Sequence, residues 1–211
     1  MDVKDLEVLA EYVGKDIEDP TLVARWAFDE KEGTIAYDSC SKSDGSVVGN
    51  PAWQPTGGKL GGALQFDGVD DCATAPYVVD PSTGPFSVFV WVRGGAPGQV
   101  ILSQADGVNW LMAGDRGGVL ATELRESGRK AKPLASQALI TDSAWHRVGF
   151  VWDGTNRTLY VDDIEVARDT QASLAGSTGD LYIGTGSTMA AASLWKGLID
   201  DVRIYNRAVK P

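Results

Sequence analysis

The chain has 211 residues, a formal net charge of −10, 25 glycines and 7 tryptophans. Its length fits one sandwich or barrel, and its scattered, outnumbered lysines and arginines argue against nucleic acid as a partner, which normally requires a basic stripe. No apolar run approaches the roughly 20 residues of a membrane span, and Met1 is followed by acids and lysine rather than by a signal peptide.

Residues 2–14 predict a short amphipathic helix, because residues 6, 9, 10 and 13 are apolar and share one helical stripe. Acids precede this stripe and Gly14 follows it, as at a helix start and stop. The segment resembles the second helix of a dockerin-type calcium-binding repeat without its loop, which implies a remnant of a preceding module. A capping helix or a frayed tail is the alternative. Residues 15–21 read as a linker, so we predict a boundary between residues 1–21 and a domain over 22–211.

From residue 22 onward, β-branched and aromatic segments alternate with glycine, proline, asparagine and aspartate clusters, a pattern that predicts an all-β fold of short strands. Residues 22–28 form the first expected strand, 38–46 a polar loop and 47–58 an irregular stretch. Residues 62–74 predict two strands around the turn Asp67-Gly68. The further expected strands are 86–92, 99–104, 109–113, 119–124, 145–152, 157–161, 164–168, 181–183 and 197–208.

The last of these segments has an unusual placement of acids. With a period of two, residues 198, 200, 202 and 204 share one face, so Asp200 lies on an apolar side, next in sequence to Asp201. A carboxylate in a packed face has to be hydrogen-bonded, paired or metal-bound. Two adjacent acids therefore suggest a cation site, and the alternative is a solvated rim at which both acids meet Arg203 or a backbone N–H.

Seven short motifs along the chain resemble, in this order, the signature of laminin-G-like domains of the concanavalin A-like lectin/glucanase group. They are Trp26-x-Phe28-Asp29-Glu30, Asp38-Ser39 with Asp44-Gly45, Gly61-Gly62-Ala63-Leu64-x-Phe66-Asp67-Gly68-x-Asp70-Asp71, Phe86-Ser87-Val88-x-Val90-Trp91-Val92, Trp145-His146-Arg147-Val148, Leu159-Tyr160-Val161-Asp162-Asp163 and the segment 197–208. The resemblance implies a two-sheet antiparallel jelly-roll sandwich whose first and last strands are adjacent. It also implies a structural calcium ion shared by Asp29 and one of Asp200 and Asp201.

Both departures from the laminin-G-like pattern place a cysteine where the family has another residue. These are Cys40, in the loop after Asp38-Ser39, and Cys72, directly after Asp70-Asp71. Because the two departures coincide, we expect a Cys40–Cys72 disulfide, with two thiols as the alternative.

Catalytic motifs are missing from the sequence. The strand motif E-x-D-x-x-E of the glucanases does not occur. Residues 121–126 echo a short motif of jelly-roll alginate lyases, but the other strands that those enzymes need do not follow. His146 is the single histidine and has no accompanying nucleophile or ligand cluster, so we expect it to be packed or at a rim. We therefore expect no catalytic residues.

Carbohydrate recognition uses exposed aromatic faces together with polar side chains that fix the sugar hydroxyls. Three tryptophans fall in expected loops or at strand ends and are candidates for such a platform, although aromatic side chains mostly bury. They are Trp53, Trp110 and Trp195. The nearby polar candidates are Asp106, Asn109, Asp115 and Arg116.

Taken together, the motifs predict a non-catalytic, extracellular module of a larger bacterial protein. Its expected partner is a polysaccharide or glycan to which it would tether an attached enzyme, and other modules of the parent protein are further partners. The alternatives are a protein–protein or adhesion module, and a polysaccharide lyase or hydrolase in which acids distant in sequence converge.

Overall fold

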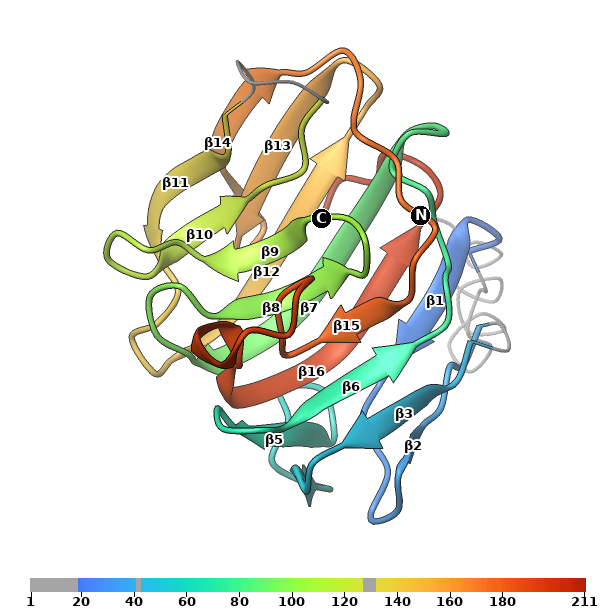
Figure 1. Cartoon of the computed structure of the whole chain (residues 1–211), viewed down its shortest axis with the longest axis vertical. Coiled ribbons are helices and arrows are strands. Elements are labelled where there is room, and N and C mark those ends of the chain that lie inside the picture. The colour runs from blue at the N-terminus through green and yellow to red at the C-terminus, as the bar shows by residue number, and fades with distance from the viewer. Residues whose placement is uncertain (1–18, 41–42, 127–131) are drawn as a thin grey trace, which may run out of the picture.

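The computed structural model describes residues 19–40, 43–126 and 132–211. Within these ranges sixteen strands form two antiparallel sheets of eight strands each, stacked as a sandwich (Figure 1). The expected all-β jelly-roll class is therefore confirmed. The helix in these ranges, the 3₁₀ turn η1 (Ala191–Ser193), is a single short turn, and no described helix is long and apolar enough to cross a membrane.

The first sheet, sheet A, forms the rear layer in Figure 1. Its strands in spatial order are β14 (Ile164–Thr170), β13 (Asn156–Val161), β12 (Trp145–Trp152), β7 (Phe86–Gly94), β16 (Lys196–Tyr205), β5 (Ala63–Asp67) and β4 (Ala52–Gln54), with β1 (Leu22–Trp26) also paired to β16. Sheet B lies in front of it. Its order is β11 (Leu134–Leu139), β10 (Val119–Thr122), β9 (Asn109–Ala113), β8 (Val100–Gln104), β15 (Leu181–Ile183), β6 (Cys72–Ala75), β3 (Gly45–Val48) and β2 (Ile35–Ala36).

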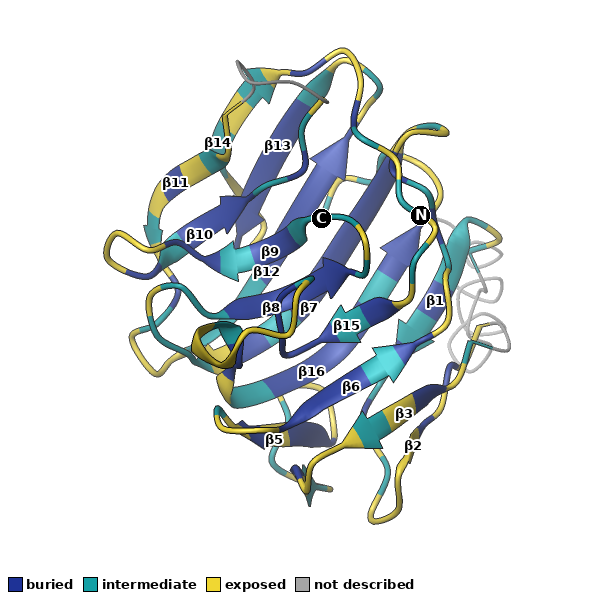
Figure 2. Cartoon of the chain, viewed as in Figure 1, coloured by how far each residue is buried: buried dark blue, intermediate teal, exposed yellow. Residues whose placement is uncertain are grey.

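The core lies between the two sheets. On β7 the alternate residues Phe86, Val88, Val90 and Val92 point into it and are almost fully buried. Figure 2 shows the buried residues concentrated in the central strands, whereas β11 and β14 at one edge are largely exposed. This single contiguous core explains why the chain folds as one sandwich.

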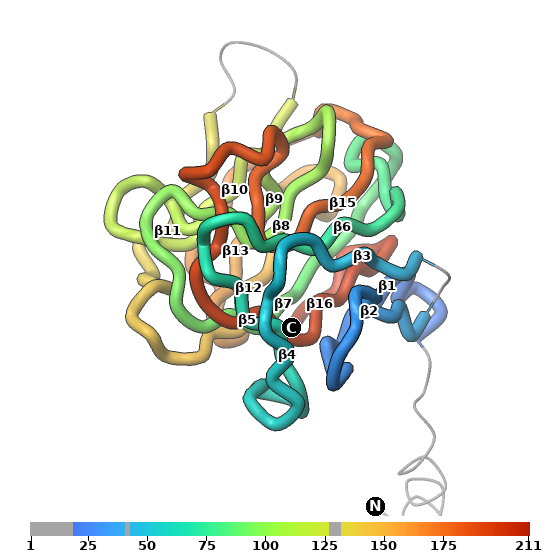
Figure 3. The backbone as a smooth tube through the Cα atoms, turned by 60° about the horizontal axis from the view of Figure 1, so that its bottom comes forward, coloured from blue at the N-terminus to red at the C-terminus, as the bar shows by residue number. Residues whose placement is uncertain are grey.

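One edge of β16 is shared by two partner strands. β5 pairs with the first half of β16, from Lys196 to Ile199, and β1 pairs with the second half, from Val202 to Tyr205. The first and last strands of the domain are therefore adjacent, as expected. Figure 3 shows β4 and the loop after it at the near end of the sandwich. We call the point where β16 changes partner, at Asp200 and Asp201, the β16 junction.

Most of the expected strands are confirmed, with three differences. Residues 47–58 are not irregular throughout, because they include the end of β3 and all of β4. The strands β2 and β11 were not expected from the sequence. The predicted helix over residues 2–14, and with it the dockerin-like segment, lies outside the described residues, so the boundary at residue 21 remains a prediction.

The predicted disulfide is wrong: Cys40 and Cys72 are not bonded to each other. Cys72 is buried on β6 opposite Val48, the last residue of β3, whereas Cys40 is exposed in the loop that precedes β3. A four-residue strand spans roughly 10 Å, and a disulfide needs Cα atoms within about 7 Å. The length of β3 therefore separates the two cysteines, and burial raises the pKa of the Cys72 thiol.

Candidate functional site

The β16 junction is built by a bulge. Asp200 is opposite Trp91 and Arg203 is opposite Phe89, so β16 has one more residue than β7 in this interval. Asp201 provides the extra residue with a φ of 50°, a conformation that aspartate tolerates better than most residues. Ile199 before the bulge and Val202 after it both lie in the core. The predicted alternation of side chains is therefore wrong before the bulge, because Leu198 and Asp200 face away from the core and not towards it.

Asp200 is nevertheless fully buried, because the loop between β4 and β5 covers it. Its Oδ2 accepts hydrogen bonds from the backbone N–H groups of Lys59 (2.7 Å) and Leu60 (2.8 Å). Its Oδ1 is buried and has no hydrogen-bond partner in the described part of the chain. Burial raises the pKa of Asp200 to about 6, helped by the negative charges of Asp201 and Asp29 and opposed by the two N–H groups.

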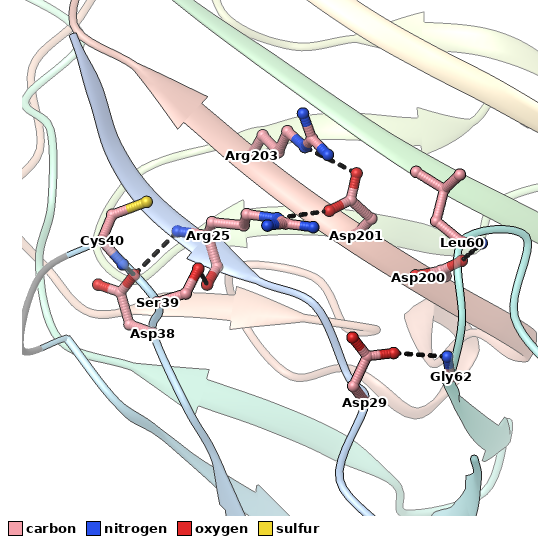
Figure 4. A network of polar contacts seen from close by, with 10 residues as sticks. All are labelled: Arg25, Asp29, Asp38, Ser39, Cys40, Leu60, Gly62, Asp200, Asp201 and Arg203. Atoms are coloured by element: carbon pink, nitrogen blue, oxygen red, sulfur yellow. Dashed lines mark hydrogen bonds and ion pairs between the residues drawn. The ribbon is translucent and has the colours of Figure 1, made fainter. Parts of the chain in front are cut away.

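Asp29 approaches the same place from the end of β1 (Figure 4). Phe28, directly before it, has a φ of 55° and turns the chain here. The Oδ1 atom of Asp29 accepts a hydrogen bond of 2.6 Å from the N–H of Gly62. A Cβ atom on Gly61, whose φ is 96°, would lie 2.5 Å from the same oxygen. The glycines of the β4–β5 loop thus let the backbone close over both carboxylates.

Asp201, the third predicted ligand, has different partners. Its Oδ1 lies 2.8 Å from Nε of Arg25, and its Oδ2 lies 2.7 Å from Nε of Arg203. Both of its oxygens therefore meet a guanidinium, the arrangement considered in the sequence as the alternative to a metal. At the junction, Asp29 and Asp200 lie together under the covering loop, whereas Asp201 forms ion pairs with the two arginines.

A second acidic cluster lies in the turn between β5 and β6. One ligand atom from each of Asp67, Asp70 and Asp71 falls within 4.8 Å of the others. Asp71 is buried, and its two oxygens accept the backbone N–H groups of Asn50 (2.8 Å) and Asp67 (2.9 Å). Its carboxylate is therefore engaged in closing the turn, unlike that of Asp200.

The tryptophan platform predicted from the sequence is wrong for two of its three members. Trp110 and Trp195 are fully buried in the core. Trp110 is the second residue of β9 and points between the sheets, and Trp195 packs under Gly95 just before β16. Trp53 is half-buried against the core, and its Nε1–H donates to the carbonyl oxygen of Gly33 at 2.8 Å.

The four polar candidates fall into separate places. Asp115 and Arg116 lie together at a depression of about 240 Å³ on the outer face of sheet B, where β9, β10 and β11 run side by side. Asp106 is at the rim of a different cavity of about 120 Å³. Asn109 accepts the N–H of Ser187 at 3.1 Å through its Oδ1, so it holds the β15–β16 loop.

We call the first of these cavities the β9–β11 depression. Its complete lining is Met112, Gly114, Asp115, Arg116, Val119, Ala121, Glu123, Pro133 and Ala135. Only Asp115 and Arg116 of these were candidates, and the longest side chains that the sequence reasoning missed are those of Met112 and Glu123. Both lie on the outward phase of their segments, and strand alternation from the buried Leu111 and Leu124 would have indicated them.

His146 is a rim residue, as expected. Its Nδ1 lies 2.8 Å from Asp162 and its Nε2 lies 3.0 Å from Asp142. Burial disfavours the charged ring, but the hydrogen bonds to Asp162 and Asp142 outweigh it and raise the pKa of His146. The ring therefore links the start of β12 to the β13–β14 turn.

A family model described as the concanavalin A-like lectin/glucanases superfamily matches residues 67–211. No curated protein matches the chain in sequence. Among solved structures, the fold is similar to domain 4 of AbnA, a GH43 extracellular arabinanase from Geobacillus stearothermophilus, in complex with arabinotriose. The TM-score is 0.70 at 20% identity, and the match covers 90% of this chain and 94% of that domain.

Two further structures share the fold at low identity. The Botulinum neurotoxin serotype D ligand binding domain in complex with N-acetylneuraminic acid has a TM-score of 0.65 at 14% identity over 90% of this chain and 48% of its own. The Trypanosoma rangeli sialidase has a TM-score of 0.60 at 16% identity over 92% of this chain and 32% of its own. The chain thus spans about half of the toxin domain and a third of the sialidase.

Proposed function

Because the chain belongs to the concanavalin A-like lectin/glucanase superfamily, and because this fold hosts both binding and catalytic proteins, we propose its function from its sites: a non-catalytic module that binds glycans and is stabilised by calcium. Fold alone does not separate binding from catalysis. The observation that carries the proposal is the β9–β11 depression.

The depression combines an apolar floor with polar groups at its edge. Met112, Val119 and Ala121 give it an aliphatic surface against which the C–H faces of a sugar ring can pack. Asp115 and Arg116 are exposed, and within the described residues neither side chain is held by a hydrogen bond or ion pair. Their carboxylate and guanidinium groups are therefore available for sugar hydroxyls.

The solved structures support the same proposal. Domain 4 of AbnA is nearly the same length as the matched part of this chain and was captured with arabinotriose. By analogy with that domain, we place the chain as a module of a larger extracellular bacterial protein that tethers an attached enzyme to a polysaccharide. Other modules of that parent are the further partners.

Calcium is assigned to the β16 junction, where Asp29 and Asp200 would hold it. The buried, unpartnered Oδ1 of Asp200 fits a cation, because an ionised carboxylate oxygen without any partner in the interior is strongly unfavourable. Two carboxylates at one loop also suit a hard cation that prefers oxygen ligands. The bound ion would supply positive charge that keeps Asp200 ionised and would join the end of β1 to the β4–β5 loop and β16.

The depression offers a direct test by titration of neutral oligosaccharides, arabinotriose among them, in calorimetry. Arg116→Gln and Asp115→Asn are expected to weaken binding by about tenfold each, the usual size of a lost charged hydrogen bond. Arg168→Gln is the matched control, since Arg168 is an exposed arginine of sheet A paired with Glu165.

Three other outcomes would each contradict a part of the proposal. Unchanged affinity in both variants would remove the depression as the site. Release of shortened sugars during the titration would show an enzyme rather than a binding module. If no oligosaccharide binds and the isolated chain instead retains another protein, the adhesion alternative replaces glycan binding.

A further inference from the structure

A second pocket lies on the outer face of sheet A, on the opposite side of the sandwich core from the β9–β11 depression. It has a volume of about 260 Å³ and is lined by Leu60, Trp91, Arg147, Asp163, Asp201 and Arg203. We call it the sheet A pocket. Of its lining residues, Asp201 was predicted from the sequence as a metal ligand, and none was predicted to bind a sugar.

Strand pairing explains how the pocket forms. Trp91 on β7 is opposite Asp200 on β16 and opposite Arg147 on β12, so these three residues make one row across the sheet. The bulge at Asp201 brings Arg203 beside this row. The loop that covers Asp200 places Leu60 next to that carboxylate (Figure 4), and Leu60 also lines the pocket.

Positive charge dominates this place in a chain whose net charge is −10. Arg147 and Arg203 line the pocket, Arg25 pairs with Asp201 behind it, and Lys59 lies with its Nζ 5.2 Å from the centre of the Trp91 ring. The acids near these four cations are Asp163, Asp201 and the buried Asp200, which lies opposite Trp91. Cations thus outnumber acids by four to three, so the pocket favours an anion.

Arg147 is preorganised, and its hydrogen-bonding capacity is not fully used. Arg147 packs 4.9 Å above the Phe89 ring and donates to Asp163 through one terminal nitrogen, at 2.7 Å. In the described part of the chain no other acceptor is bonded to its guanidinium. Asp163 is 57% exposed and therefore holds Arg147 weakly. A carboxylate from outside can take the remaining N–H groups in the fork geometry that arginine offers.

Trp91 gives the pocket its second feature. It is half-buried, with its ring on the solvent side of sheet A, and the charged end of the exposed Lys59 side chain lies over its face. Lysine side chains move readily, so a ligand that brings its own negative charge can displace or pair with the ammonium. An aromatic face next to paired guanidinium groups fits a pyranose ring that carries a carboxylate.

We propose that the sheet A pocket is a separate binding site for acidic sugars of the uronic acid type, with Trp91 against the ring and Arg147 and Arg203 at the carboxylate. This site borders the β16 junction through Leu60 and Asp201 and is separate from the β9–β11 depression, so it does not depend on the residues assigned to glycan binding there.

The experiment compares sugars that differ only in the carboxylate. Oligosaccharides of galacturonic acid and of galactose are titrated into the wild-type chain, Arg147→Gln, Trp91→Leu and Arg116→Gln, with Arg168→Gln as the charge control. We expect the acidic oligomer to bind more tightly than the neutral one, and Arg147→Gln and Trp91→Leu each to weaken it about tenfold. Arg116→Gln and Arg168→Gln should leave its affinity within about twofold, and added salt should weaken it.

The outcomes separate this proposal from the proposed function. Equal affinity for both oligomers, or loss of acidic binding in Arg116→Gln alone, overturns the sheet A pocket and leaves the depression intact. Loss of neutral binding in Arg116→Gln with acidic binding retained supports two sites. Since Trp91→Leu can disturb β7, its thermal midpoint is measured in parallel, and Arg147→Gln at an unchanged midpoint decides the result.

Discussion

The β16 junction and the Asp67–Asp71 turn both gather acidic side chains, yet they solve the problem of burying a carboxylate differently. In the turn, both oxygens of Asp71 accept backbone N–H groups. In the junction, Asp200 has two N–H donors on Oδ2 and none on Oδ1. The number of acids at a site therefore matters less than whether one buried carboxylate oxygen remains without a partner.

The largest expected effect that tests this comparison is the pH dependence of the metal-free chain. The folded pKa of Asp200 is raised to about 6 from an ordinary value of 3.8. Folded protein therefore holds a proton that unfolded protein has lost, and stability falls as pH rises from about 4 to about 6. The loss is roughly 3 kcal/mol at most by linkage.

Asp200→Asn makes this effect visible. Asparagine is a neutral isostere whose oxygen can still accept the N–H groups of Lys59 and Leu60, so in chelator at pH 7 the variant is expected to be more stable than wild type. Urea unfolding at pH 4.5 and pH 7 measures it. A wild type that gains stability over this pH interval as much as the variant does would show that Asp200 is not a buried, destabilising charge.

Calcium should have the next largest effect, and only at the junction. An ion at 100 times its dissociation constant stabilises the fold by about 2.7 kcal/mol, which is roughly 5–10 °C in thermal midpoint for a chain of this size. The shift is expected in wild type and in Asp71→Asn, but not in Asp200→Asn or Asp29→Asn. It should grow from pH 5 to pH 7, because the ion competes with the proton on Asp200.

A calcium shift lost in Asp71→Asn and kept in Asp200→Asn would move the ion to the turn. If chelator and calcium give the same midpoint in every variant, the assignment of calcium is wrong. The scans are read by circular dichroism, with magnesium as the control cation, since it prefers a smaller and more rigid site.

In the turn itself, Asp71→Asn is expected to cost about 1–2 kcal/mol without any dependence on calcium. The amide can accept only one of the two N–H groups that the carboxylate accepts, and a buried donor left unsatisfied costs about that much. Urea unfolding with and without calcium checks it. Unchanged stability would mean that water replaces the lost acceptor and that the turn tolerates a backbone N–H group without a protein partner.

The smallest expected effect comes from His146. Its contacts with two acids make a second pH-dependent contribution to stability, away from the β16 junction. Its pKa is raised, so its contribution to stability is complete below the ordinary histidine value and is lost as pH rises above it. Because Asp142 and Asp162 are both largely solvated, less than about 1 kcal/mol is expected. His146→Gln should lower stability most below about pH 6 and progressively less as pH rises, calcium present or not; a stability loss that grows with rising pH would contradict it.

The sequence predicted most of the fold because strand alternation and turn residues are local signals. It also identified Asp29 and Asp200 through the laminin-G-like motifs, although calcium there is still to be tested. It could not predict that Asp200 faces away from the core, since the bulge at Asp201 depends on β16 changing partner from β5 to β1. Periodicity read along one strand contains no information about its neighbours.

The prediction of an exposed tryptophan platform was wrong for a related reason. Trp110 and Trp195 stand near strand ends in the sequence, but the second sheet covers strand ends as well as centres. Trp91 is half-buried and Arg93 is exposed, whereas Ser87 and Phe89 in the same phase are buried, so the outer face of β7 meets solvent only towards the end of the strand. Which face a run exposes is decided by what packs on it, and here that is a loop from residues 55–62.

The pairing of β1 with β16 has a mechanical consequence for a module held between two attachments. Leu22 is opposite Tyr205, so the described chain enters and leaves at the same end of an antiparallel ladder. Tension between those ends would open the ladder one rung at a time, the weakest way to load backbone hydrogen bonds. The contacts of Arg207 with Asp19 and Thr21 are the first that such a force would break. Asp29 and Asp200 lie just beyond the last paired residues of β1 and β16, so an ion bound there would resist further separation of the two strands.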